Sequence, residues 1–167
     1  MSGLTGGCAC GAVRYRLASG PMFVNCCHCA DCQRQVGSAF VINAIIEEDR
    51  IEIQSGELRR VPMPTDSGDV HDIYRCAECG TALWSDYGGR PMRFVRATTL
   101  DERGALKPDA HIFTRTKLPW VRIPEDQPAF EVFYDLETQW SPEGLARRKA
   151  LLGERWNWIG EGLEASR

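Results

Sequence analysis

The eight cysteines of this 167-residue chain fall in three tight clusters, and their spacing constrains the fold more than any other feature. Two cysteines separated by two residues can bind one metal ion across a tight turn, because a tetrahedral zinc site needs its sulfur ligands close together. Gly80 directly follows such a pair, and a glycine there can take the positive φ that turns backbone N–H groups toward the sulfurs. The sequence therefore predicts metal sites. The clusters are Cys8-x-Cys10, Cys26-Cys27-x-Cys29-x-x-Cys32 and Cys76-x-x-Cys79.

Two other chemical interpretations of these cysteines remain open. In an oxidising compartment they would form a disulfide framework, whereas in a reducing cytosol this spacing favours metal. An iron–sulfur cluster also takes cysteine ligands, and its brown colour would be visible at once. The sequence begins without the basic and apolar regions of a signal peptide, so we expect a cytoplasmic protein that binds zinc.

The composition argues against several classes of function. Apolar residues make up 43% of the chain, which is enough to bury a core without help from metal. The net charge is −3 and no basic stripe is present, so we expect no nucleic-acid partner. No run of about 18 apolar residues occurs either, so we expect no membrane partner.

Strand patterns dominate the first two-thirds of the chain. Residues 12–17, residues 50–53 and parts of residues 92–97 alternate apolar and polar side chains, which is typical of half-buried strands. Residues 40–46 are almost continuously apolar and predict a strand buried on both faces. Residues 62–69 are rich in Pro, Gly and Asp and predict an exposed loop. We therefore expect a small, mainly β, antiparallel fold.

The last quarter of the sequence predicts a helical tail over residues 141–167 that packs on a β domain over residues 1–140. Ser141 suits the N-cap, Pro142 suits the first helical position, and Gly153 can interrupt the helix. Apolar residues recur at helical spacing and either pack on the β core or form a homo-oligomer contact anchored by tryptophan. These residues are Leu145, Leu152, Trp156, Ile159 and Leu163.

Two of the clusters are suited to close one four-cysteine site. Each of the pairs Cys8/Cys10 and Cys76/Cys79 is followed by glycine, so both can form tight turns. Four thiolates leave no open position on the metal, so such a site would be structural and would pin the N-terminal strand to the turn at Gly80.

The middle cluster would then supply a second metal site with three sulfurs. By spacing alone, either Cys26 or Cys27 can join Cys29 and Cys32, and nothing local decides between them. Three ligands leave a fourth position for water or for a substrate thiolate. The residues from Ala30 to Gln35 predict a short helix directly after this cluster.

Motifs around the cysteines, together with short matches farther along, resemble a known family over about residues 5–130. The motifs lie at residues 7–15, 27–32, 37–40 and 75–81, followed by 99–101, 108–113, Trp120 and 126–130. They are similar to those of the glutathione-dependent formaldehyde-activating enzymes, a family that also includes the centromere protein V domain. The resemblance implies a mainly β, tent-like fold similar to that of the Rab-chaperone zinc proteins.

The resemblance also implies two zinc ions with different roles. One would be structural, and the other would be catalytic and held by three cysteines, with Cys26 left over. The implied ligands are Cys8, Cys10, Cys76 and Cys79 for the structural ion, and Cys27, Cys29 and Cys32 for the catalytic ion.

The activity that the resemblance implies is formation of S-hydroxymethylglutathione from glutathione and formaldehyde, which is classed with the carbon–sulfur lyases. Zinc can serve this chemistry by binding the thiol and lowering its pKa, or by polarising the carbonyl group. We favour thiol binding, because three thiolate ligands make the ion a poor Lewis acid. The alternative is a zinc-stabilised binding module without catalytic activity.

Glutathione carries two carboxylates, so its binding site should offer cations or other hydrogen-bond donors. Our candidates for contacting the substrate are Arg34 in the short helix, the Ser38 hydroxyl and His111. His28 lies between two expected ligands, and we expect its ring to point away from the metal. Gln33 stands where many relatives have a basic residue, which leaves another thiol open as the substrate.

Overall fold

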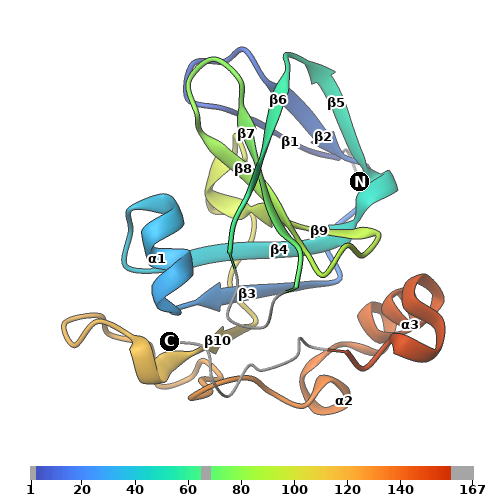
Figure 1. Ribbon diagram of the computed structural model, residues 1–167. Coiled ribbons are helices and arrows are strands. Elements are labelled where there is room, and N and C mark those ends of the chain that lie inside the picture. The colour runs from blue at the N-terminus through green and yellow to red at the C-terminus, as the bar shows by residue number, and fades with distance from the viewer. Residues whose placement is uncertain (1–2, 65–68, 159–167) are drawn as a thin grey trace.

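The computed structural model describes residues 3–64 and 69–158, which form a mainly β fold with short helices (Figure 1). This confirms the expected fold class. The strands are β1 (Leu4–Gly7), β2 (Arg14–Leu17), β3 (Phe23–Cys27), β4 (Val41–Glu47), β5 (Ile51–Ser55), β6 (Leu58–Pro62), β7 (His71–Cys76), β8 (Ala82–Tyr87), β9 (Met92–Arg96) and β10 (Ala110–Ile112). The helices are α1 (Ala30–Val36), α2 (Leu136–Gln139) and α3 (Pro142–Leu152), and short 3-10 turns occupy Glu48–Arg50, Ala97–Thr99, Thr114–Thr116 and Gly153–Arg155.

The strands form two sheets. Seven strands pair in the order β10-β3-β4-β9-β8-β7-β6, and three pair in the order β1-β2-β5. All pairs are antiparallel except β10 with β3, which run parallel. In Figure 1, β3 and β4 cross the middle of the molecule, with the small sheet on one side and α2 and α3 on the other. Among the described residues, no helix is long and apolar enough to span a membrane.

Strand β4 lies between β3 and β9, and its two faces enter two different cores. Ala44 and Ile46 point into a core between the two sheets, which we call the inter-sheet core, whereas Ile45 points into a second core on the opposite face. This explains the continuous apolar run in the sequence, because a strand covered on both faces has no polar side. The strand predicted over residues 40–46 is therefore confirmed with a shift of one residue.

The second core joins the large sheet to the C-terminal segment, and we call it the tail core. The rings of Phe23 and Trp140 stack with their centroids 5.1 Å apart. Trp140 Nε1 donates to the Tyr134 hydroxyl at 3.1 Å, and this hydroxyl donates to Asn25 Oδ1 at 2.9 Å. The polar atoms of both aromatic side chains are thus satisfied although they are buried. Leu136 completes the contact from α2.

Helix α3 begins where the sequence predicts it to begin. Ser141 caps it by accepting a hydrogen bond from Gly144 N at 3.1 Å, and the helix ends at Leu152 before Gly153, whose φ is 57°. Leu145, Leu152 and Trp156 of the predicted apolar stripe pack on the tail core. The other two stripe residues, Ile159 and Leu163, lie outside the described residues, as do residues 65–68 of the predicted loop.

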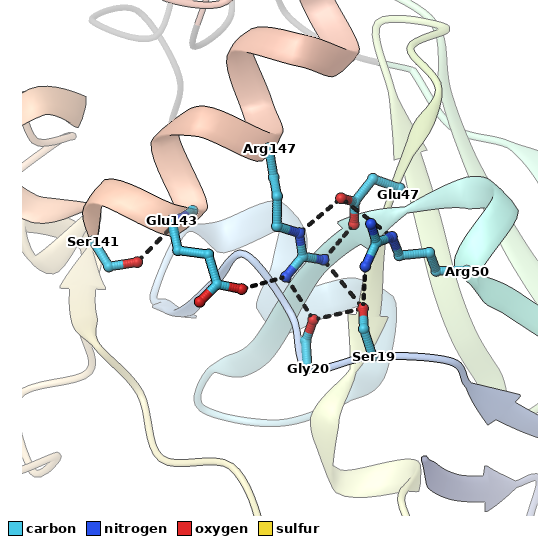
Figure 2. Close-up of polar contacts among 8 residues, drawn as sticks. Ser19, Gly20, Glu47, Arg50, Ser141, Glu143 and Arg147 are labelled. Carbon is cyan, nitrogen blue, oxygen red and sulfur yellow. Dashed lines mark hydrogen bonds and ion pairs between the residues drawn. The ribbon is translucent and has the colours of Figure 1, made fainter. Parts of the chain in front are cut away.

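An ion pair between the partly buried Arg147 and the buried Glu47 fastens α3 to the end of β4 (Figure 2). Arg147 donates to both carboxylate oxygens of Glu47, at 2.8 Å and 2.5 Å, and also to Gly20 O at 3.0 Å. Burial opposes the charge of Glu47, but the hydrogen bonds from Arg147 hold the pKa of its carboxyl below the usual range. Arg50 contacts the same carboxylate at 3.4 Å. Two-oxygen pairing of this kind fixes the orientation of the helix as well as its position.

Candidate metal centres and the adjoining cavity

The structure brings the first and third cysteine clusters together beside the inter-sheet core. Cys8 and Cys10 follow β1, Cys76 ends β7, and the four sulfurs of the group lie within 4.8 Å of one another. The Sγ atoms of Cys8 and Cys10 are 3.4 Å apart, and those of Cys10 and Cys76 are 3.9 Å apart. A tetrahedron with metal–sulfur bonds of about 2.3 Å has edges of about 3.8 Å. Cys79 completes a group that fits one metal ion.

Backbone N–H groups turn toward these sulfurs as the glycine suggested. Gly80 has a φ of 74°, which confirms the predicted left-handed turn. Cys79 N lies 3.5 Å from Cys76 Sγ, and Val13 N lies 3.2 Å from Cys8 Sγ. Such donors stabilise the negative charge of a thiolate and orient it toward a metal. The backbone around the first and third cysteine clusters therefore favours binding of a metal ion by these sulfurs.

The middle cluster forms a separate three-cysteine group. Cys27 ends β3, Cys29 caps α1, Cys32 lies in the first turn of α1, and their sulfurs are within 4.8 Å of one another. Cys29 Sγ accepts a hydrogen bond from Cys32 N at 3.3 Å. Hydrogen bonds from the Cys27 and Cys32 thiols hold the pKa of Cys29 well below its usual range. Within the described residues, no fourth Cys, His, Asp or Glu joins the group, so a bound ion would keep one position open.

Cys26 lies apart from this group. It immediately precedes Cys27 on β3, and successive side chains of a strand point to opposite faces. The structure places Cys26 with His28 and His111 instead. Burial raises the pKa of the Cys26 thiol to about 12 and lowers that of His28 to about 4.

A cavity of about 470 Å³, a size typical of small-molecule sites, is linked to the three-cysteine group through Arg96, although Cys27, Cys29 and Cys32 do not line it. Its wall includes the end of α1, one turn beyond Cys32, and also Val41, the register partner of Cys27. On the other side the wall includes Cys79 and Gly80 of the four-cysteine group. The remaining lining residues are Gln35, Val36, Ser38, Phe40, Ile42, Arg75, Thr81, Ala82, Arg96, Thr98 and Thr99.

Arg96 is the buried cation of this cavity, and only 3% of it is exposed. Its Nη1 donates to Asn43 Oδ1 and its Nη2 donates to Gln35 Oε1 at 3.2 Å, whereas its Nε has no hydrogen-bond partner among the described residues. Burial lowers the pKa of Arg96, and the nearby thiols of Cys32 and Cys27 act in the opposite direction. Arg96 therefore brings positive charge to the three-cysteine group and to the wall of the cavity, and its buried Nε has no partner among the described residues.

Sequence reasoning missed Arg96 because an arginine in a half-buried strand is ordinarily assigned to solvent. Position 96 lies on the same face of β9 as Met92 and Phe94, and Arg93 on the other face is buried as well. Arg75 forms another part of the wall, where it donates to Gln35 O at 2.8 Å and to Gly80 O at 3.0 Å. It thus ties the end of α1 to the turn of the four-cysteine group.

The substrate residues proposed from the sequence have different surroundings in the structure. Ser38 lines the cavity. Arg34 lies on the exposed side of α1 with 77% of its side chain accessible, and it is 3.7 Å from Asp31. His111 is buried against His28. Gln33 Nε2 donates to His28 O at 2.7 Å and so holds α1 against the chain that precedes it. The roles of Arg34, Ser38 and His111 in substrate binding stay predictions.

Known proteins are similar to much of the length of this chain. The family model described as "Glutathione-dependent formaldehyde-activating enzyme" matches residues 3–116. A protein of Halomonas elongata with the provisional name glutathione-dependent formaldehyde-activating enzyme is 29% identical over 130 residues, which cover 72% of this chain and 80% of that protein. A crystal structure of a Rhodobacter sphaeroides protein is similar with a TM-score of 0.47 and 23% identity, covering 63% of this chain and 92% of that one. The family match includes all eight cysteines and ends before α2 and α3.

Proposed function

Because this chain belongs to the glutathione-dependent formaldehyde-activating enzyme family, we propose that it is a zinc enzyme that joins a thiol to formaldehyde. The proposed thiol is glutathione, and the product is its S-hydroxymethyl adduct. In this reaction the sulfur forms a bond to the carbonyl carbon, the C=O double bond becomes a single bond, and the thiol proton ends on the new hydroxyl group. The enzyme would be a carbon–sulfur lyase working in the direction of synthesis, in the cytoplasm.

The observation that carries this proposal is the three-cysteine group, which has no fourth protein ligand among the described residues and lies close to Arg96, a lining residue of the cavity of about 470 Å³. A zinc ion on Cys27, Cys29 and Cys32 would supply a position for the substrate thiol and lower the pKa of that thiol. The four-cysteine group has no such open position, which supports a structural role. In a binding module without activity, we would expect a fourth protein ligand to fill the last position on the second metal ion. Among the described residues, the three-cysteine group has no such ligand.

The charge of the cavity suits a thiol that carries a carboxylate. Arg96 has a buried N–H without a partner, and a carboxylate oxygen is the acceptor that would satisfy it most strongly. Arg75 adds a second guanidinium to the same wall. We therefore assign recognition of a glutathione carboxylate to Arg96 and Arg75.

Hydroxyl groups provide the neutral donors that an aldehyde oxygen needs. Ser38, Thr81 and Thr98 line the cavity together with the two arginines. A hydroxyl can donate to the carbonyl oxygen, where negative charge develops as the sulfur attacks. This arrangement supports aldehyde binding in the same cavity as the thiol.

The function is tested by measuring the rate at which glutathione and formaldehyde combine. Exchange NMR at equilibrium gives this rate. We expect the full-length, zinc-loaded protein to accelerate exchange in proportion to its concentration. Heat-denatured protein with the same zinc content serves as the control for free metal. Protein that holds zinc on both cysteine groups and gives no acceleration would contradict the proposal.

Replacing Arg96 by methionine should raise the KM for glutathione by about 10-fold or more, because a charge-assisted hydrogen bond is worth about 1.5–3 kcal/mol. Steady-state kinetics would be compared with those of Arg34→Met, which removes an exposed arginine of α1. The Arg96 effect should be much smaller with 2-mercaptoethanol, which carries no carboxylate. If Arg34→Met raises the KM and Arg96→Met does not, the carboxylate binds at the surface of α1 instead.

A further inference from the structure

We propose that Cys26, His28 and His111 form a third metal site, distinct from the two cysteine groups. The side chains are all buried, with 1%, 0% and 7% exposed, and their ligand atoms lie within 4.8 Å of one another. One thiol and two imidazoles are a donor set that suits Zn²⁺ and similar borderline ions. The site would hold a divalent ion of this class.

The pairing of β3 with β10 builds this site. His111 is the register partner of Cys26 in the parallel pair, so their side chains leave the sheet on the same face. His28 follows Cys26 by two residues and therefore returns to that face, and its backbone N donates to Ile112 O at 3.0 Å. Cys27, between them, points to the opposite face and belongs to the three-cysteine group. Two sites thus share one strand without sharing a ligand.

The distances within the site fit a small tetrahedral ion. Cys26 Sγ lies 3.6 Å from His28 Nε2, and bonds of about 2.3 Å to sulfur and 2.05 Å to nitrogen give an edge of about 3.6 Å. His28 Nε2 lies 2.9 Å from His111 Nδ1, whereas an edge between two such nitrogens is about 3.3 Å. The rings would separate by a few tenths of an ångström when an ion replaces the proton between them.

The imidazole of His111 is already oriented for ligation. His111 Nε2 donates to Gln127 Oε1 at 2.6 Å, which leaves the lone pair of Nδ1 facing His28 and Cys26. A metal-ligating histidine commonly donates its other N–H to an oxygen in this way, because that bond fixes the tautomer and the direction of the ring. His28 Nδ1 has no partner among the described residues. The polar contacts of this ring are made by Nε2, with Cys26 Sγ and His111 Nδ1 of the proposed site.

The role that this site supports is structural. Strand β10 has three residues, and it is held at the edge of the sheet by a parallel pairing with β3. An ion bound by Cys26 and His28 from one strand and by His111 from the other would cross-link residues 83 positions apart in sequence. It would thereby fix the strand from which the three-cysteine group extends.

Metal content tests the site directly. Full-length protein is unfolded with a chelator, refolded with excess Zn²⁺, gel-filtered and analysed for zinc and protein. We expect three zinc ions per chain in the wild type and two in Cys26→Ser. Refolding with Co²⁺ identifies the ligands, because the difference spectrum between wild type and Cys26→Ser should contain a thiolate-to-cobalt charge-transfer band from one sulfur.

Two results would overturn the proposal: two zinc ions in the wild type, or three in Cys26→Ser. If Cys26→Ser fails to refold, His111→Gln removes a ligand from the other strand and should also reduce the content from three to two. Gln127 is the finer probe, since Gln127→Ala keeps all three ligands and should only weaken retention of the third ion during dialysis. The readout is metal content, so a failure here leaves the proposed enzyme activity standing, and an inactive protein leaves this site standing.

Discussion

Cys29→Ser is expected to lower the rate of adduct formation by about 10³-fold while the protein stays folded. The activity falls because one of three ligands is lost from the proposed catalytic zinc, whose stabilisation of charge is worth several kcal/mol. The fold survives because residue 29 is also the N-cap of α1, where its side chain accepts a hydrogen bond from Cys32 N. Serine makes the same cap and makes it well.

The measurement combines kinetics with urea unfolding and zinc analysis on the same sample. The expected result is a midpoint of unfolding close to that of the wild type, one zinc ion fewer and almost no catalysis. A Cys29→Ser protein that keeps full activity would show that the three-cysteine group is not the catalytic centre. If Cys29→Ser both unfolds the protein and abolishes activity, the three-cysteine group has a structural role like that of the four-cysteine group, and the proposed difference between the two groups is wrong.

Cys76→Ser, unlike Cys29→Ser, is expected to destabilise the fold, by about 4 kcal/mol or more. The reason is that the binding free energy of a structural metal contributes directly to the free energy of folding. Cys76 is fully buried in the inter-sheet core and ends β7, and it lies 3.9 Å from Cys10, which is 66 residues earlier. Loss of the metal would release the N-terminal strand from this contact and leave a buried hydroxyl without a metal partner.

Urea unfolding in excess Zn²⁺ measures this effect, and Cys29→Ser serves as the matched variant because it also removes one thiolate. A protein so unstable that it does not refold agrees with the expectation. A Cys76→Ser protein as stable as Cys29→Ser would contradict it and would leave the four-cysteine group without a structural role. The two variants together therefore separate the contributions to stability and catalysis.

Local signals in the sequence were sufficient for features that depend on a few neighbouring residues. Gly80 after a cysteine pair predicted a left-handed turn, and the turn is present. Ser141 and Pro142 predicted the start of α3, and the apolar run at residues 40–46 predicted a buried strand. In each case the residues that decide the conformation lie within one turn or one strand of one another.

Features that depend on distant pairing could not be read from the sequence in this way. His28 and His111 are 83 residues apart, and only the register of β10 on β3 brings them together. Arg96 is an arginine on the Met92 and Phe94 face of β9, and its burial results from packing of α1 and β4 around it. By spacing alone, Cys26 was as good a candidate as Cys27 for the three-cysteine group. The alternation of side chains along β3 places Cys26 on the opposite face from that group.

The tail core has a consequence for the order in which this chain can acquire its structure during synthesis. Strands β3 and β4 come early, yet Phe23 on β3 stacks on Trp140, and Glu47 on β4 pairs with Arg147. The four cysteines of the first and third clusters are complete once residue 79 has left the ribosome, and the inter-sheet core is complete once Leu100 has followed, so metal can fasten this core while the other face of the large sheet is still uncovered. That face keeps its apolar side chains in water until the tail arrives, and a nascent chain stalled between residues 116 and 140 would be the species most exposed to chaperones and to aggregation.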